Sequence, residues 1–225
     1  MGKVEEDVND PVRHFWQVRL QEIKERLNSN NFVAYVVETA AEAGELVLAD
    51  ILPTSGARSL SYGGSGTLKA TGLHDFFSRP NCGYEVIRAD EPEVTPTEKY
   101  ERRRQALSVD MYFSGVNAVT GEGHLVNLDM IGNRVSAITF GPRNVTLLVG
   151  RNKIVRDLES ARLRIKELAA PVNAMRLDAK TPCVKTSHCV DCSSPGRICN
   201  TWMITEKSFP KGRIKVVLIN EDLGI

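Results

Sequence analysis

The middle of the chain, residues 109–155, alternates between short, mainly apolar runs and loops rich in Gly and Asn. Short apolar runs bounded by such loops are typical of buried strands joined by turns. We therefore expect strands at 109–113, 125–128, 135–140 and 145–149.

A different spacing marks the first helix. Asp10 can cap a helix start, and Pro11 suits the first helical position, where its missing N–H would have had no partner. Apolar residues then recur at three- and four-residue steps and predict one buried stripe, formed by Val12, Trp16, Leu20, Ile23 and Leu27. A strand at 32–37 is expected next.

Two capping boxes predict further helices, because each side chain of such a pair can satisfy a free backbone N–H at the helix start. Thr39 with Glu42 predicts a helix to about Asp50, and Thr95 with Glu98 predicts another. Strands at 58–62 and 84–87 are expected on either side of a helix at 65–77. A last helix is expected from Asn152 to Pro171, with its register set by Ile154, Leu158, Ala161, Ile165 and Leu168.

Strands that alternate with helices require crossover helices packed over a largely parallel sheet. We therefore predict an α/β fold in three layers, with a mostly parallel sheet and additional strands. The length of 225 residues suits one domain, residues 1–225, which includes a Cys-rich loop at 178–202.

Composition excludes several classes of protein. A net charge of +1 provides no global field to attract nucleic acid or an anionic membrane. No apolar run approaches the ~18 residues of a membrane span, and the acidic, polar start does not resemble a signal peptide. We expect a cytoplasmic protein, and a homodimer as the commonest assembly.

The first candidate site is a glycine-rich turn between a predicted strand and a predicted helix. Glycines let the backbone bend sharply and let a ligand approach the free N–H groups at the helix start, which favour an anion. The sequence matches neither a phosphate-binding P-loop nor a dinucleotide fingerprint, and a turn without a ligand is the alternative. The candidate residues are Gly63, Gly64, Ser65, Gly66 and Thr67.

Polar residues at the ends of the central strands form the second part of this candidate site. Side-chain amides donate and accept hydrogen bonds without carrying charge, although Asn beside Gly is also ordinary turn chemistry. The amides are Asn117, Asn127, Asn133 and Asn152, and the charged candidates are Asp129, Arg134 and Lys153. We expect Lys153 to be the cation that faces an anionic substrate.

Four of the five cysteines lie within 17 residues of a loop punctuated by Pro and Gly: Cys183, Cys189, Cys192 and Cys199. In a reducing compartment such a group is better explained by a metal than by disulfides. Four thiolates suit a tetrahedral ion or a cubane cluster, and a single CxxC pair with wide flanks favours a [4Fe-4S] cluster over zinc. Free thiols are the other alternative. Cys82 stands alone and is expected to be a small buried hydrophobe.

Four strings of sequence resemble the lactate-utilisation (LUD) domain family. They are YGGSGTL at 62–68, SGVNAVTGEGHLVNLDMIGNRVSAI at 114–138, GPRNVTLLVGRNKIV at 141–155 and the closing KVVLINEDLGI. The resemblance implies a Rossmann-like sheet similar to that of ribose-phosphate isomerases, CoA transferases and formyltetrahydrofolate cyclo-ligases. It also implies a link to oxidation of lactate, usually beside iron-sulfur partner proteins. No residue aligns with the CoA-transferase glutamate, since Glu122 lies in a turn, so the resemblance leaves open whether the chain is an enzyme.

Three functional hypotheses follow. The first is a component of an iron-sulfur electron-transfer system for lactate or a related 2-hydroxy acid, which binds a small anionic metabolite. The second is a regulatory or assembly module with a structural zinc and no catalytic role. The third is an isomerase or ligase that acts on a sugar phosphate.

Overall fold

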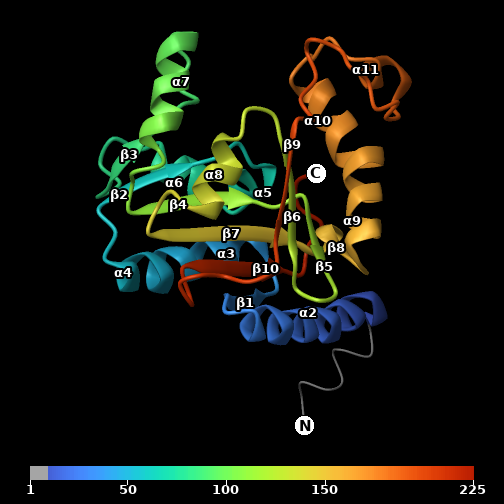
Figure 1. The fold of residues 1–225 in the computed structure, drawn as a ribbon. Coiled ribbons are helices and arrows are strands. Elements are labelled where there is room, and N and C mark those ends of the chain that lie inside the picture. The colour runs from blue at the N-terminus through green and yellow to red at the C-terminus, as the bar shows by residue number, and fades with distance from the viewer. Residues whose placement is uncertain (1–9) are drawn as a thin grey trace.

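In the computed structural model, which describes residues 10–225, six parallel strands form the central sheet (Figure 1). Their spatial order is β1 (Val33–Val37), β10 (Ile214–Ile219), β7 (Asn144–Gly150), β4 (Met111–Gly115), β2 (Ser59–Tyr62) and β3 (Glu85–Ile87). Because all six strands run in the same direction, their carboxyl ends meet at one edge.

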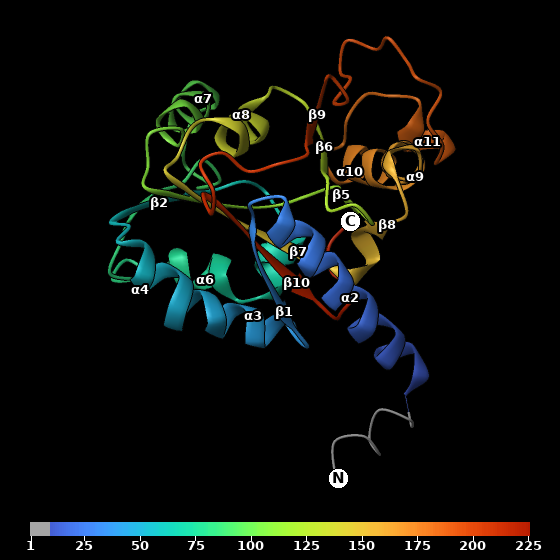
Figure 2. The same cartoon turned by 60° about the horizontal axis from the view of Figure 1, so that its bottom comes forward.

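Helices cover one face of this sheet. They are α3 (Ala40–Leu46), η1 (Val47–Ile51), α4 (Leu52–Ser55), α5 (Gly66–Ala70) and α6 (Leu73–Phe77). The other face is covered by α2 (Pro11–Ser29) and α8 (Asn133–Thr139), as Figure 2 shows for α2. Each face of the sheet has its own hydrophobic core, and alternate residues of β10 pack into one or the other. Val216 and Leu218 face α2, and Val217 and Ile219 face the opposite side.

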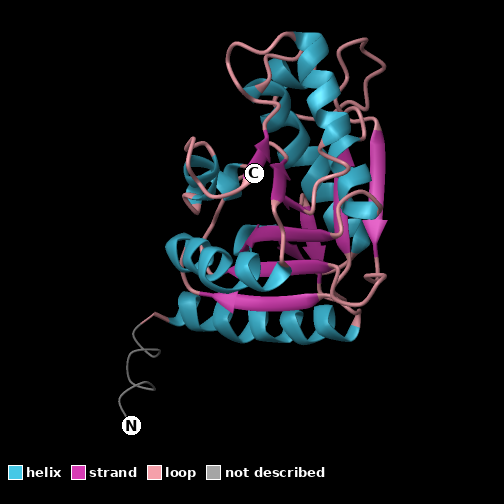
Figure 3. Ribbon diagram, turned by 90° about the vertical axis from the view of Figure 1, so that its left-hand side faces the viewer, coloured by secondary structure: helices cyan, strands magenta, loops and turns pink. Residues whose placement is uncertain are grey.

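A second, four-stranded sheet packs on the α2 side of the first. Its order is β8 (Ile154–Val155), β5 (Ala118–Thr120), β6 (Leu125–Asp129) and β9 (Thr201–Thr205). Its outer face packs against α9 (Leu158–Arg164), η3 (Ile165–Ala169) and the start of α10 (Ala170–Arg176). This layer adds to the predicted three, and Figure 3 shows both sheets. The remaining elements are α7 (Pro96–Gln105), the short turn η2 (Arg151–Lys153) and α11 (Cys183–Thr186).

The predicted cap residues are confirmed, but the reciprocal half of each capping box is not formed in the described structure. Glu42 accepts the N–H of Glu38 rather than that of Thr39, and Glu98 accepts from Arg102. Asp10, Thr39 and Thr95 each accept a hydrogen bond from a backbone N–H of the first helical turn. The stripe of α2 buries Leu20, Ile23 and Leu27, whereas Val12 at its start is exposed.

The strand predicted at 135–140 is wrong, because this segment forms α8. Val135 and Ile138, three residues apart, are both buried, as on one face of a helix. In so short an apolar run, periodicity alone does not separate a helix from a strand. The carboxylate of Asp129 accepts the backbone N–H of Arg134 at 3.1 Å and so satisfies the helix start.

The last helix begins later and ends later than predicted. Ile154 and Val155 form a strand, and Asp157 caps α9 by accepting the N–H of Ser160. Pro171 does not stop the helix, because the π-helical turn η3 precedes it and gives its ring room. The helix therefore reaches Arg176.

Two smaller predictions also need correction. The helix predicted at 65–77 is broken at Gly72, whose φ of +75° ends α5 and starts α6. Cys82 is half-buried rather than buried, with its thiol 3.6 Å from the carbonyl oxygen of Tyr84. Within residues 10–225 no helix is both long and apolar enough to cross a membrane.

Candidate functional site

The carboxyl edge of the central sheet brings together most of the residues predicted from the glycine and asparagine loops. Strands β2, β4, β7 and β10 are neighbours, and each is followed at this edge by a loop. The glycine turn (63–67) follows β2 and lies close to β4: a Cβ added at Gly63 would lie 2.8 Å from the Tyr112 hydroxyl and 3.2 Å from Ser114 Oγ. The backbone of the turn can approach β4 this closely only because Gly63 has no side chain.

Lys153 is the central side chain of this edge. It follows β7 at the end of η2 and is 4% exposed, and its Nζ donates to Thr67 Oγ1 at 2.8 Å. Burial, together with the nearby Arg164 and Arg134, lowers the pKa of Lys153 from 10.5 to about 7. The folded chain thus keeps an amine at this point that is protonated in only part of the molecules near neutral pH.

Two arginines surround the amine. Arg164 of α9 donates from Nη1 to the carbonyl oxygen of Asn117 at 2.7 Å and from Nε to that of Asn152 at 2.9 Å. Arg134 of α8 donates from Nη2 to Asn117 Oδ1 at 2.9 Å. The loops after β4 and β7 are therefore joined through Arg164, and the glycine turn lies against Arg134. We call Lys153, Arg134 and Arg164 the cation cluster.

The positive charge of this cluster is poorly compensated. Among residues 10–225, the one carboxylate that pairs with it is Asp129, whose Oδ1 is 3.6 Å from Arg134 Nε. Two polar atoms at this edge, Arg164 Nη2 and Ser114 Oγ, are also buried without a hydrogen-bond partner in the described structure. Buried polar atoms normally have partners, so these two atoms are left with hydrogen-bonding capacity that a ligand would use.

Residues that follow β10 cover the cluster. Asn152 accepts the N–H of Leu223 at its Oδ1 and donates to the Gly224 carbonyl from its Nδ2, at 3.1 and 3.4 Å. Thr67 Oγ1 donates to the Leu223 carbonyl at 3.2 Å. The amide of Asn152 therefore holds residues 223–224 over Lys153.

Other predicted residues make no hydrogen bond or ion pair with the cluster in the described structure. Asn127 is fully buried in the middle of β6, and neither atom of its amide has a partner in the described structure. Asn133 is half-buried at the start of α8, and Gly64 is exposed. Ser65 caps α5 by accepting the N–H of Leu68 at 3.2 Å. Since α5 has five residues, its dipole adds little to the site.

Sequence reasoning missed Arg164, Ser114 and the residues 223–224. A sequence signal for Arg164 was present. Arg164 stands between Ala161 and Ile165, whose spacing predicts the buried face of α9. A basic residue beside that face was a candidate for a buried cation. Ser114 and residues 223–224 lie within the strings that resemble the LUD family, but no spacing or composition marked them as part of a site.

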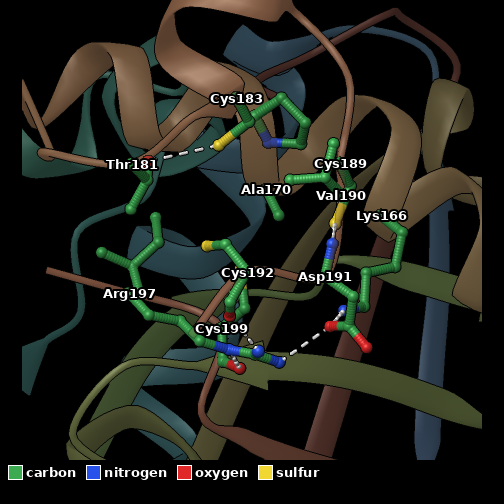
Figure 4. A pocket seen from close by; sticks show the side chains of 12 residues that line it. Lys166, Ala170, Thr181, Cys183, Cys189, Val190, Asp191, Cys192, Arg197 and Cys199 are labelled. Atoms are coloured by element: carbon green, nitrogen blue, oxygen red, sulfur yellow. Dashed lines mark hydrogen bonds and ion pairs between the residues drawn. The ribbon is translucent and has the colours of Figure 1, made fainter. Parts of the chain in front are cut away.

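The four clustered cysteines line one pocket beside η3 and the start of α10 (Figure 4). Cys183 begins α11, Cys189 and Cys192 lie in the loop that follows, and Cys199 lies two residues before β9. Lys166 and Arg197 also line the pocket, and both contact Asp191. All four cysteines are free thiols and half-buried.

The thiols differ in acidity. Hydrogen bonds from Ser194 and the charge of Arg197 lower the pKa of Cys192. Burial raises the pKa of Cys199, and the neighbouring Cys189 and Cys183 raise it further. The described residues contain no group of three or more His, Cys, Asp or Glu side chains already arranged to hold a metal ion.

The fold defines an α/β protein with its candidate ligand site at the carboxyl edge of a parallel sheet. The chain belongs to the LUD domain family, which it matches over residues 20–219. This membership connects it generally with lactate utilisation. It is also similar to a crystal structure of a DUF162 family protein from Deinococcus radiodurans, with 16% identity, 91% of this chain and 97% of that chain covered, and a TM-score of 0.45. No protein of curated function matches the sequence.

Proposed function

We propose that the cation cluster binds a small anionic metabolite, of which lactate or a related 2-hydroxy or 2-oxo acid is the first candidate. The observation that supports this is the burial of Lys153 and the partial burial of Arg164 without an ion-pair partner among the described residues. A buried charge without a counter-charge costs several kcal/mol. A bound carboxylate would supply the missing charge.

Each residue at the edge has a definite part in this proposal. Arg164 Nη2 and Ser114 Oγ have hydrogen-bonding capacity left for the ligand. Asn117 fixes Arg134 through its Oδ1 and Arg164 through its backbone carbonyl, so it orients the cations. Asn152 holds residues 223–224 over the site. The family membership favours lactate over other carboxylates.

Calorimetric titration with lactate, pyruvate and ribose 5-phosphate tests this proposal. We expect a carboxylate to bind to the wild-type chain and Lys153→Met to weaken it by about tenfold or more, since a charge-assisted hydrogen bond contributes about 1.5–3 kcal/mol. Binding of the sugar phosphate alone would favour an isomerase-like or ligase-like function. Unchanged carboxylate affinity in Lys153→Met would contradict the role of Lys153.

Lys215→Met is the matched control. Lys215 is half-buried at the start of β10, at the opposite edge of the sheet, and burial also lowers its pKa. Its Nζ donates to Asn144 Oδ1 at 3.1 Å. Lys215→Met should therefore leave the affinity for the anion unchanged.

We also propose that the four cysteines hold a metal centre, with a [4Fe-4S] cluster preferred to zinc. In support, four thiols line a single pocket, and Lys166 and Arg197 can offset the charge of thiolates. Since no three of the groups are yet arranged around one point, the loop must close on the metal as it binds. A cluster here would supply one-electron transfer, as expected for a protein that works with iron-sulfur partners.

Anaerobic purification followed by metal analysis distinguishes the alternatives. A brown protein with about four irons per chain supports the electron-transfer hypothesis. A colourless protein with one zinc supports a structural module, and a metal-free protein contradicts both.

A further inference from the structure

The amine of Lys153 is buried and has few polar neighbours, unlike a lysine that only binds an anion at the surface. Its one hydrogen bond in the described structure is to Thr67 Oγ1, at 2.8 Å. Two glycines adjoin it: a Cβ added at Gly115 or Gly224 would lie 3.5 or 3.3 Å from Nζ. The amine is therefore flanked at these two positions by backbone that carries no side chain.

The protonation of this amine also departs from that of an ordinary lysine. Burial and the two arginines bring its pKa to about 7, so a large fraction of the molecules carries a neutral amine near neutral pH. A neutral lysine amine is a nucleophile, whereas a protonated one is not.

We propose that Lys153 attacks the carbonyl carbon of a bound 2-oxo acid and forms an imine, while Arg164 and Arg134 hold the neighbouring carboxylate. This rests on the proposed function, because the same cation cluster must bind the acid. In a 2-oxo acid the carbonyl carbon is bonded directly to the carboxylate. A carboxylate paired with the arginines thus presents that carbon to the adjacent amine.

The step balances without an oxidant or a reductant. The lone pair of Nζ forms the N–C bond, the carbonyl oxygen takes up the proton that Nζ loses, and a carbinolamine results. The hydroxyl then leaves as water with the remaining hydrogen of Nζ, and the nitrogen lone pair forms the C=N bond. Thr67 Oγ1 is placed to take up the proton that Nζ loses, because it accepts from Lys153 Nζ. Its own proton, which it donates to the Leu223 carbonyl, becomes free for the acid once residue 223 moves aside.

Residues 223–224 must move aside for the acid to enter. They are held over the amine by three side-chain hydrogen bonds, two from Asn152 and one from Thr67. Gly224 itself is exposed, so this cover lies at the surface. Its return over the bound acid would exclude water and protect the imine from hydrolysis.

Reductive trapping tests the proposal. The intact chain is incubated with pyruvate and cyanoborohydride, and its mass is measured before peptide mapping. We expect one adduct per chain, with a mass increase equal to pyruvic acid less one oxygen atom, located on Lys153. Lys215, whose pKa is also lowered by burial, is the internal control and should stay unmodified.

Lactate supplies the matched ligand, because it has the carboxylate but no carbonyl, and it should protect Lys153 from trapping without forming an adduct. Calorimetry with pyruvate in the absence of reductant separates the two proposals. Pyruvate that binds without labelling Lys153, or labelling spread over exposed lysines, overturns the imine but not the anion site. Failure of both carboxylates to bind overturns both.

Discussion

The cation cluster and the cysteine pocket lie close along one helix, yet the chain builds them in opposite ways. Arg164 ends α9 and contacts the loops of the sheet edge, while Lys166, two residues later, lines the cysteine pocket. Parallel strands fix the first site, whereas a loop carries most of the second (Figure 1). The cluster is thus organised before any ligand binds, and the cysteine pocket needs its metal to become organised.

The two sites also differ in what they cost the stability of the ligand-free fold. The sheet edge keeps buried positive charge in place at the expense of stability, a pattern typical of functional sites. The cysteine loop leaves its thiols half-buried, which costs little without metal. Four comparisons of variants from the two regions test the contrast, and they are taken from the largest expected effect to the smallest.

Replacement of the CxxC pair should have the largest effect. In Cys189→Ser/Cys192→Ser we expect metal content to fall from one centre per chain to nearly none, because two of four thiolates are lost. Metal analysis after anaerobic reconstitution measures this. Cys82→Ser is the control, since Cys82 lies outside the pocket. The affinity for the anion should not change in the double variant. Full metal content in the double variant would exclude this pair as ligands.

The pH dependence of stability should show the cost of the buried amine. The pKa of Lys153 is about 7 when folded and 10.5 in its ordinary state, so between these values the unfolded chain binds more protons. Its contribution to stability therefore rises with pH, by up to about 1.4 kcal/mol per pH unit. Lys153→Met removes this rise.

Urea denaturation at about pH 7.5 and pH 9.5 measures the difference. The free energy of unfolding of the wild type should increase by about 2–3 kcal/mol relative to Lys153→Met between these values. A parallel pH dependence in both chains would mean that the amine is not buried in the folded protein.

Two arginines, one from each region, each donate to a pair of backbone carbonyls and offer the next comparison. Arg164→Met should lower the free energy of unfolding by about 2–3 kcal/mol, because two charge-assisted hydrogen bonds to loop carbonyls are lost. Arg197 also donates to two carbonyls, those of Cys192 and Cys199, but in a loop. Arg197→Met should cost less than about 1 kcal/mol in the metal-free chain. Equal losses would show that the cysteine loop is as well organised as the sheet edge.

The smallest effects are expected from two asparagines. Asn152→Ala removes both side-chain hydrogen bonds to residues 223–224 and should cost about 1 kcal/mol, with faster association of the anion. Asn200 makes two hydrogen bonds beside the cysteine loop, to the carbonyls of Met130 and Arg197, but it is exposed. Asn200→Ala should change stability by less than about 0.5 kcal/mol. Stopped-flow mixing shows whether association is faster in Asn152→Ala alone.

Local signals predicted much of the fold. The caps at Asp10, Thr39 and Thr95 were recognisable because a side chain three residues from a backbone N–H decides the helix start. The α8 segment was misassigned because its apolar spacing suits both a strand and a helix. Pro171 was misread because the π-helical turn that accommodates it has no recognised sequence signature.

The sequence by itself determined that the chain alternates strands and helices, carries glycines and amides after its strands, and gathers four cysteines in one loop. Only the tertiary structure decided that Lys153 meets Thr67, 86 residues away, and that Arg164 lies near the amine without a carboxylate partner among the described residues. The physical reason is that propensity and capping act over a few neighbouring residues. The burial of a side chain and the charges around it depend on residues that are distant in sequence and that only the complete fold places beside it.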